Sequence, residues 1–255
     1  MGCRHVTVQQ AKYEWVLETV RDLIATLDVG DALPSERALA AEIGVSRMTL
    51  RRAVEQLVRE GQVVRRRGAG TFVAAPKISQ ALTITSFSED MRSRGFAPSS
   101  RTLSCEEMYA GPRLSRCLEV SPGDRMLRIV RLRLADDAPM AIETLHTPVA
   151  VVDGLSGDDL TGGSFYQLLY ERFGIVLERG MQTVEPTVTD EIESELLEVP
   201  LHSPAFLFER TTWSRDGRCV EFVRSVYRGD RYRLTAELRP TQVVTAPAPP
   251  QAGRP

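Results

Sequence analysis

Two short helical patterns follow each other closely in residues 35–61, and their order limits the folds open to this part of the chain. In the first, Ser35 is a good N-cap, and Gly44 suits the left-handed conformation that ends a helix. One residue later, Ser46 caps a second pattern, which Gly61 closes. Two short helices joined by a glycine-containing turn predict a helix-turn-helix.

The flanking segments extend this unit into a domain. Residues 12–27 carry apolar side chains at spacings of three and four, which predicts an amphipathic helix. Residues 62–74 are typical of two β-strands around a glycine-rich turn, the wing of a winged helix. We therefore expect a winged helix-turn-helix domain over residues 10–75, with its second short helix entering the major groove of DNA.

The charge distribution supports a nucleic-acid partner. The chain has a net charge of −2, but residues 46–67 contain seven arginines and only two glutamates. Arg47, Thr49 and Arg51 lie on the polar face of the second helix pattern. A basic patch on an otherwise acidic protein is typical of binding to a polyanion. The alternative, a solvated arginine run on an ordinary three-helix domain, is less well supported by the spacing.

Length and motifs exclude several classes of protein. At roughly 150 residues per domain, a chain of 255 residues suggests two domains. No apolar run is long enough to span a membrane and no secretory signal is present, so we expect a cytoplasmic protein with no membrane partner. The four cysteines and three histidines lack ligand spacing, and we expect no metal and no cofactor.

The second half contains an unusual pair of arginines. Residues 126–134 alternate as a strand does, which places Arg131 and Arg133 on one face. Two guanidinium groups so placed repel each other unless an anion lies between them, and a phosphate could bond to both. An exposed face paired with carboxylates fits the spacing equally well. Residues 138–145 predict the adjacent strand, which would bring Glu143 within reach of the same pocket.

Two later segments could border this pocket. Ser164 and Gln167 predict a capping box at the start of a helix, where free amides could help to hold a phosphate, or Ser164 could be a plain N-cap. Even spacing places Glu221 and Tyr227 on one face of a strand in residues 220–234. These two side chains could bond sugar hydroxyls or an amine, or lie on a surface strand.

The stretch LPSERALAAEIGVSRMTLRRAVEQLVREG followed by VVRRRGAGTFVA resembles the DNA-binding domain of the GntR superfamily of bacterial transcription regulators. The chemistry agrees with this resemblance: arginine can make two hydrogen bonds to a guanine edge, and hydroxyls and the amides at a helix start can bind phosphates. Met48 differs from the family, which commonly has a small hydroxyl residue at that position. The resemblance implies DNA contacts at Arg37, Ser46, Arg47, Thr49, Arg51, Arg67, Gly68 and Gly70.

The stretches ALTITSFSEDMRSRG, RIVRLRLADDAPMAIET and VEFVRSVYRGDRYRL resemble the UTRA effector domain of the HutC subfamily, whose fold is similar to chorismate lyase. The fold class implied is α+β: an N-terminal winged helix-turn-helix domain followed by a chorismate-lyase-like α/β effector domain built on an antiparallel sheet. We expect a linker at 76–81, the effector domain at 82–240 and a disordered proline-rich tail at 241–255.

Within this subfamily, the resemblance is greatest to regulators of amino-sugar use that sense glucosamine 6-phosphate or N-acetylglucosamine 6-phosphate. It implies that the effector phosphate is bound by Ser86, Ser88, Arg131, Arg133 and Ser164, assisted by Tyr166. It implies that the sugar is bound by Glu143, Glu221 and Tyr227. Ser86 and Ser88 rest on the resemblance alone.

Together these features predict a homodimeric repressor, and not an enzyme, that binds an inverted repeat in double-stranded DNA. Its operator would lie near genes for amino-sugar uptake or breakdown, and a phosphosugar effector would release it. Three alternatives remain open. The effector could be another sugar phosphate, an organic acid such as urocanate or an antibiotic-like molecule; the protein could activate some promoters; or it could be an enzyme of the chorismate-lyase kind.

Overall fold

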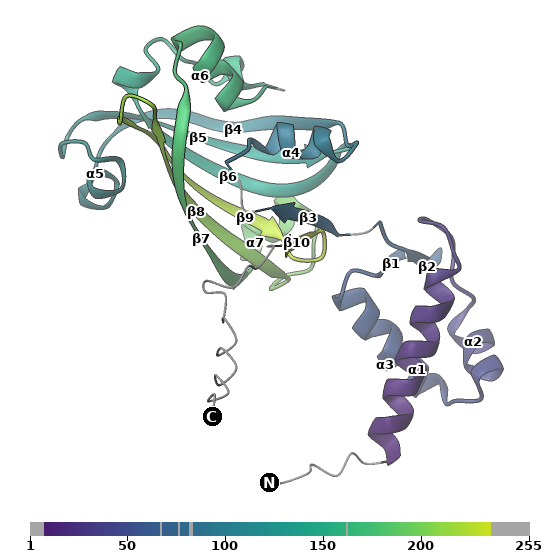
Figure 1. The fold of residues 1–255 in the computed structure, drawn as a ribbon. Coiled ribbons are helices and arrows are strands. Elements are labelled where there is room, and N and C mark those ends of the chain that lie inside the picture. The colour runs from purple at the N-terminus through teal and green to yellow at the C-terminus, as the bar shows by residue number, and fades with distance from the viewer. Residues whose placement is uncertain (1–7, 67, 76, 82–83, 162, 236–255) are drawn as a thin grey trace, which may run out of the picture.

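The computed structural model describes residues 8–66, 68–75, 77–81, 84–161 and 163–235 (Figure 1). Within these ranges, a helical part with a small hairpin precedes a part built on a large sheet. No helix in the described ranges is long and apolar enough to cross a membrane. The expected tail at 241–255 lies outside the described residues.

The first part has the predicted order of elements. Ser35 Oγ accepts a hydrogen bond from the Ala38 amide, and Ser46 Oγ accepts one from the Thr49 amide, so both predicted N-caps are confirmed. Gly44 ends the first short helix with a φ of 73°, a conformation that favours glycine. The elements are α1 (Val8–Ala25), α2 (Glu36–Ile43), α3 (Arg47–Arg59), β1 (Val63–Arg66) and β2 (Gly70–Val73).

The three helices and the hairpin enclose a core of their own. Its buried members come from the apolar faces of all three helices and from both strands: Val16, Val20, Leu39, Leu50, Val54, Leu57, Val63 and Val73. The strands β1 and β2 pair antiparallel, and Ala32 adds an antiparallel bridge to Phe72. This arrangement is the winged helix-turn-helix that the sequence predicts.

The second part is built on one antiparallel sheet of six strands. In spatial order the strands are β4 (Pro98–Tyr109), β5 (Arg125–Ala135), β6 (Ala138–Pro148), β9 (Cys219–Arg228), β8 (Pro204–Ser214) and β7 (Leu177–Val188). The helices are α4 (Phe87–Ser93), α5 (Pro112–Leu118), α6 (Phe165–Phe173) and α7 (Glu191–Leu197), with short 3₁₀ helices η1 (Val149–Val151) and η2 (Asp158–Leu160). The expected α+β class with an antiparallel sheet is confirmed.

The helices cover both faces of this sheet. Phe87 and Met91 of α4 and Leu169 of α6 pack against one face. Leu118 of α5 and Leu197 of α7 belong to core clusters on the other face. The sheet face between α4 and α6 is therefore the one that carries the odd-numbered side chains of β5.

A second, small sheet takes one of its strands from the expected linker. The strand β3 (Ile78–Ala81) pairs in parallel with β10 (Tyr232–Thr235), and the Ile78 amide donates to the Arg231 carbonyl at 2.7 Å. Residues 78–81 are thus a strand and not a plain connection as expected. Their pairing partner lies about 150 residues later in the chain, and a local pattern gives no sign of such a contact.

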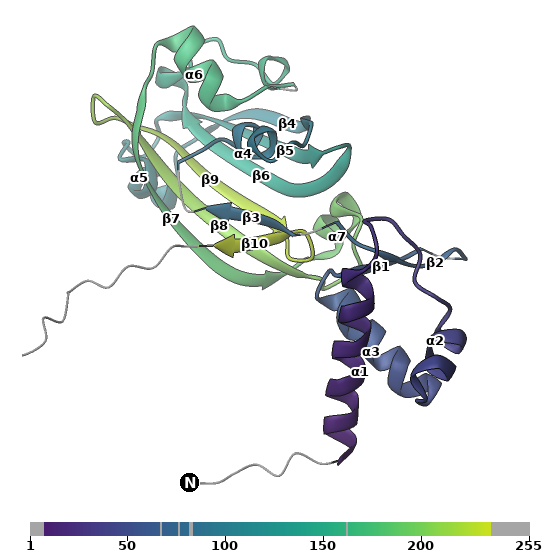
Figure 2. The same ribbon diagram turned by 45° about the vertical axis from the view of Figure 1, so that its right-hand side comes forward.

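The two parts touch beside the loop that joins β9 to β10 (Figure 2). Lys77 Nζ donates to the Gly229 carbonyl at 2.7 Å. Gly61, just after α3, has a φ of +71°, and a Cβ at this position would overlap the Asp230 carbonyl oxygen. The helical part, called the head below, therefore rests on the loop that follows β9, the strand that carries Glu221 and Tyr227.

Candidate functional site

The start of α3 presents polar side chains to solvent. Arg47 and Arg51 are exposed, and Met48 between them is 65% exposed. Ser46 Oγ lies 2.9 Å from Thr49 Oγ1, so these two hydroxyls stand together at the helix N-terminus. Helix N-termini with hydroxyl and arginine side chains favour phosphate groups, because amide dipoles and positive charge act together.

The remaining predicted DNA contacts are also at the surface where they are described. Arg37 is exposed in the first turn of α2. Gly68 and Gly70 are exposed in the wing turn, with φ of +75° and +122°. Arg67 lies outside the described residues. Beside the turn, Arg66 lies over the Phe72 ring at 4.6 Å, which holds one wing arginine against the hairpin.

In the second part, the two arginines of β5 are buried. Arg131 is 3% exposed and Arg133 is 2% exposed. The antiparallel register places Arg131 opposite Glu143 on β6. The alternative of an exposed strand face is therefore wrong. That alternative also predicted carboxylate partners for the arginines, and Arg131 does have one.

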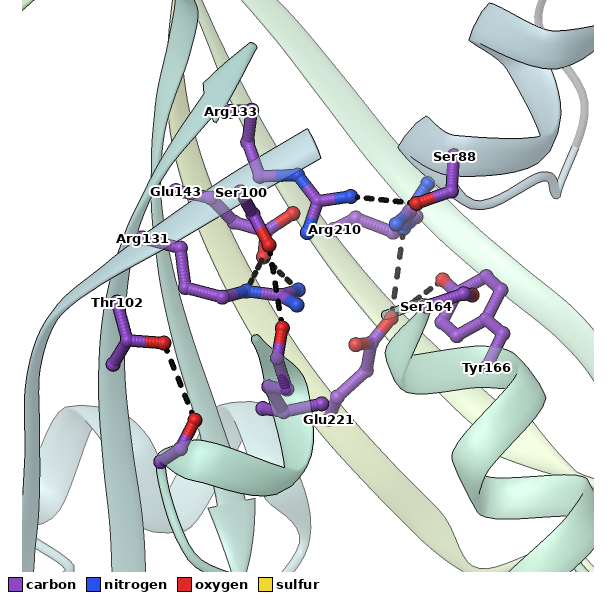
Figure 3. A network of polar contacts seen from close by, with 12 residues as sticks. Ser88, Ser100, Thr102, Arg131, Arg133, Glu143, Ser164, Tyr166, Arg210 and Glu221 are labelled. Carbon is purple, nitrogen blue, oxygen red and sulfur yellow. Dashed lines mark hydrogen bonds and ion pairs between the residues drawn. The ribbon is translucent and has the colours of Figure 1, made fainter. Parts of the chain in front are cut away.

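Arg131 and Glu143 form a buried ion pair (Figure 3). Arg131 Nε donates to Glu143 Oε1 at 2.9 Å, and Nη2 donates to the same oxygen. Burial raises the pKa of the Glu143 carboxyl, but the charges of Arg131 and Arg133 outweigh burial and lower it to about 2. Glu143 is therefore ionised at neutral pH and neutralises one of the two arginines.

Arg133 has no such counter-ion. Its Nη2 donates to Ser88 Oγ at 3.0 Å, and its guanidinium carbon lies 4.7 Å from the centre of the Phe87 ring. Its Nε and Nη1 are buried and have no hydrogen-bond partner among the described residues. Burial and the neighbouring Arg131 lower the pKa of Arg133 to about 10, so the fold pays for holding this charge in place.

A second carboxylate lies across the same face of the sheet. Glu221, 1% exposed on β9, accepts hydrogen bonds at Oε1 from the Tyr166 hydroxyl at 2.6 Å and from Thr212 Oγ1 at 2.8 Å. Arg210 Nε lies 3.7 Å from the same oxygen. Burial raises the pKa of the Glu221 carboxyl, and the charge of Arg210, which lowers it, does not outweigh this effect.

Two helices begin at this cluster. Ser86 caps α4 in a full capping box with Glu89. Ser164 caps α6 by accepting from the Gln167 amide at 3.3 Å. The predicted capping box at Ser164 is only half formed: the Ser164 hydroxyl accepts from the Gln167 amide, while the Gln167 side chain donates to Glu171. All three predicted serines, Ser86, Ser88 and Ser164, are buried.

Tyr227 completes the predicted set. It is 8% exposed, and its ring contacts those of Phe208 at 4.8 Å and Tyr232 at 4.5 Å. Burial raises the pKa of the Tyr227 hydroxyl to about 12, so the phenol stays protonated and can donate. A cavity at this point is lined by Thr85, Ser86, Phe87, Asp90, Glu143, Gln182, Phe208, Arg210, Val223, Ser225, Tyr227 and Tyr232.

The nine side chains that the sequence predicts for the effector come from α4, β5, β6, α6 and β9. The structure brings them to one face of the sheet, and eight of them are buried while Tyr166 is half-buried. Figure 3 shows Ser88, Arg131, Arg133, Glu143 and Glu221 of this set pointing toward a common region.

Sequence reasoning missed Arg210 and Thr212, which face this region from β8. The segment FLFERTTWS places Phe208, Arg210 and Thr212 at even spacing, a signal that these side chains share a face. Only the pairing of β8 with β9, which sets Thr212 opposite Glu221, reveals the inward direction.

The chemistry available to this cluster is anion binding. The guanidinium groups of Arg131, Arg133 and Arg210 face the carboxylates of Glu143 and Glu221. Asp90, which also lines the cavity, is paired with Arg94, so the cluster carries excess positive charge. Arg131 Nη1, Arg133 Nε and Nη1, and Arg210 Nε are buried with no hydrogen-bond partner among the described residues. Unsatisfied charged donors cost several kcal/mol each, and a ligand with several acceptor oxygens would remove that cost.

The buried ion pair makes a prediction about stability. Glu143→Gln is expected to lower the free energy of unfolding by about 3 kcal/mol near neutral pH, because it leaves Arg131 buried without a counter-ion. The pKa of Glu143 is about 2 in the folded chain against an ordinary value of 4.5, so its contribution is complete above pH 4.5 and is lost as the pH falls toward 2. Urea unfolding across this range should show the two proteins converging at low pH.

The matched control is Glu106→Gln, which breaks the exposed ion pair of Glu106 with Arg128 on the neighbouring strand. This change is expected to cost less than about 1 kcal/mol at every pH, because solvent screens an exposed pair. An equal cost for the two substitutions would contradict the assignment of the larger effect to burial.

Two family comparisons cover most of the chain. Residues 12–73 match the family described as bacterial regulatory proteins, gntR family, and residues 93–233 match the UTRA domain. The first match spans the helix-turn-helix and the wing, and the second spans the six-stranded sheet with Arg131, Glu143 and Glu221.

Individual relatives also match across most of the chain. The HTH-type transcriptional repressor NagR of Bacillus subtilis is 40% identical over 201 residues, 78% of this chain and 82% of that protein. The histidine utilization repressor of Pseudomonas aeruginosa is 32% identical over 204 residues, 79% of this chain and 80% of that protein. The crystal structure of PhnF from Mycobacterium smegmatis superposes with a TM-score of 0.64 at 30% identity, covering 88% of this chain and 99% of that one.

Proposed function

Because this chain belongs to the GntR family of bacterial regulatory proteins and carries a UTRA domain, we propose that it represses transcription until a sugar phosphate releases it from its operator. It is a DNA-binding transcription repressor of the HutC type and not an enzyme. The effector in this proposal is glucosamine 6-phosphate or N-acetylglucosamine 6-phosphate, and its site is the buried arginine cluster.

The observation that carries the proposal is the set of unpartnered guanidinium N–H groups. Arg133 and Arg210 hold buried donors, and Arg131 holds one more beyond its pair with Glu143. A phosphate dianion offers three terminal oxygens and matches the excess positive charge. Ser86, Ser88 and Ser164 stand at the same place as additional hydrogen-bonding groups.

The choice of an amino sugar rests on the groups around the phosphate site. The carboxylates of Glu143 and Glu221 and the phenol of Tyr227 supply acceptors and a donor for hydroxyl groups and for an amino or acetylamino substituent. The resemblance of the UTRA segments to amino-sugar regulators points in the same direction. In this proposal, the target genes serve the uptake or breakdown of N-acetylglucosamine or chitin.

The mechanism requires two states of the protein. Two recognition helices in a homodimer would read an inverted repeat, with half-sites set by the helical turn of DNA. The effector must bind better to the state in which the heads have the wrong spacing, because a ligand with equal affinity for both states shifts nothing. Coupling on the order of 1 to 3 kcal/mol is typical and would weaken operator binding by about 5- to 150-fold.

The test is thermal unfolding of the full chain with a panel of ligands: glucosamine 6-phosphate, N-acetylglucosamine 6-phosphate, glucose 6-phosphate, free N-acetylglucosamine and urocanate. A ligand at 100 times its Kd adds about 2.7 kcal/mol and should raise the Tm by a few degrees. A shift with the two amino-sugar phosphates alone supports the proposal. A shift with urocanate alone, or none with either amino-sugar phosphate, would reject this effector and leave the DNA-binding function unaffected.

The DNA-binding half makes its own prediction at Arg47. Arg47→Ala should weaken operator binding by about tenfold or more, because an arginine on the recognition helix contributes about 1 to 3 kcal/mol through a base or phosphate contact. Fluorescence anisotropy on an operator fragment selected in vitro with the wild-type protein would measure this change at two salt concentrations.

Arg59→Ala is the control, since Arg59 is an exposed arginine in the last turn of the same helix. It should lower operator affinity by less than about threefold, because it is one exposed charge away from the start of α3. Equal losses for Arg47→Ala and Arg59→Ala would mean that the start of α3 has no special role.

A further inference from the structure

We propose that Arg210 is a third cationic effector-binding residue, which holds the phosphate together with Arg133. This inference rests on the function proposed above and extends it to a side chain on β8. Figure 3 shows Arg210 with its ion pair to Glu221, in the region that Arg133 enters from β5 and Tyr166 from α6. Arg210 also lines the cavity that contains Ser86 and Tyr227.

The hydrogen bonds of Arg210 leave donors free. Its Nη1 makes a long contact of 3.5 Å to the Thr85 carbonyl, next to the N-cap of α4. Its Nε is buried and makes no hydrogen bond within the described residues. The guanidinium carbon lies 5.3 Å from the centre of the Tyr166 ring, so the ring flanks this side chain without accepting its N–H groups.

Glu221 is the nearest counter-ion, but it does not satisfy Arg210. The separation of 3.7 Å between Arg210 Nε and Glu221 Oε1 is an ion pair and exceeds the usual length of a hydrogen bond. The same oxygen already accepts from Tyr166 and Thr212. The cation is thus stabilised electrostatically while its donors stay available to a ligand.

The charge balance gives Arg210 a distinct role. Glu143 pairs with Arg131 and Glu221 lies nearest Arg210, while Arg133 has no carboxylate partner among the described residues. With both glutamates ionised, the three arginines carry one more charge than these two carboxylates, and removing Arg210 would take away the excess positive charge that a buried anion needs. Its contribution should therefore be greatest for a ligand that carries two negative charges on one group.

A purely structural role predicts different behaviour. If Arg210 only neutralised Glu221, its replacement would lower stability and leave the affinity for a phosphate ester unchanged. If it binds the phosphate, its replacement should change how affinity depends on the charge of the ligand. The second proton of a phosphate ester dissociates with a pKa near 6, so pH adjusts that charge.

The experiment is isothermal titration calorimetry of the full chain with glucosamine 6-phosphate between about pH 5.5 and 7.5. Arg210→Gln should lose about 100-fold in affinity at the upper end. In the wild type, affinity should rise with pH as the phosphate group becomes a dianion. In Arg210→Gln this rise should be smaller. Arg210→Lys, which restores the charge without the planar fork, should recover most of the affinity and the slope.

Arg224→Gln is the matched control, because Arg224 lies on the adjacent strand β9 with its side chain 41% exposed and a weak pair to Glu193 at 4.0 Å. It should bind glucosamine 6-phosphate as the wild type does. Wild-type affinity and an unchanged pH profile in Arg210→Gln would overturn the assignment of Arg210 while the proposed function stands. A wild-type protein that binds no sugar phosphate would overturn both.

Discussion

Replacing Arg133 with alanine is expected to abolish release by the effector while operator binding stays within about threefold of wild type. Arg133 is 2% exposed and keeps two buried nitrogens without a partner among the described residues. Removing a buried charge that a ligand phosphate would pair with costs about 2 to 5 kcal/mol, so effector affinity should fall by about 1,000-fold. The measurement is operator binding by anisotropy during titration with glucosamine 6-phosphate.

Stability separates this role from a structural one. The pKa of Arg133 is lowered to about 10 by burial and by Arg131, so the folded chain holds this charge at a cost. Arg133→Met, which fills the volume without the charge, should therefore keep or raise the Tm and still fail to respond to effector. Arg128→Ala on the same strand, whose side chain is 37% exposed, should respond normally. Normal release in both Arg133 variants would remove Arg133 from the site.

The burial of charged groups without full partners makes this cluster unfavourable for the stability of the folded chain. A core built for stability alone would not place three guanidinium groups on one sheet face, because each must lose its hydration. Glu143 offsets Arg131 fully, whereas Glu221 offsets Arg210 only through a contact of 3.7 Å. The remaining cost is the free energy that an anionic ligand can recover on binding, which favours a role in recognition over one in packing.

The local parts of the fold could be predicted from the sequence because their signals are local. The caps at Ser35 and Ser46 and the turn at Gly44 lie within a few residues of the helices that they define. The alternation that directs Arg131 and Arg133 to one face is likewise a property of one strand. Glu143 followed because the adjacent strand in the chain is also the adjacent strand in the sheet.

The parts that could not be predicted depend on contacts between distant segments. Arg210 faces the cluster because β8 lies beside β9, and β3 exists because β10 returns to pair with it from the end of the domain. The Gln167 side chain could complete a capping box by accepting from the Ser164 amide, but in the structure it donates to Glu171, four residues on. In each case the sequence allows more than one partner, and the tertiary arrangement selects among them.

The junction between the two parts leads to the last prediction, at Gly61. Gly61→Ala is expected to reduce the effector-induced loss of operator affinity to less than about threefold, while effector binding itself stays close to wild type. A Cβ at this position would overlap the Asp230 carbonyl oxygen, so the head must shift against the loop that follows Tyr227. That loop leads into β10, whose Tyr232 lines both the effector cavity and the cavity between the two parts. If the head is displaced there, effector binding in the cavity should no longer change the position of the head.

Gly44→Ala provides the control for backbone strain. Gly44 also ends a helix of the head, with a φ of +73° against +71° for Gly61, and a Cβ there would meet nothing within 4 Å. Both substitutions should lower the Tm, since each forces alanine into the left-handed region at a cost of about 1 kcal/mol, and Gly61→Ala should lower it further because of the overlap with Asp230. Only Gly61→Ala should lose the coupling, measured as the ratio of operator Kd with and without glucosamine 6-phosphate. Equal coupling in the two variants would show that the contact between residue 61 and Asp230 does not transmit the signal. Both variants strain the backbone, but only Gly61→Ala alters that contact.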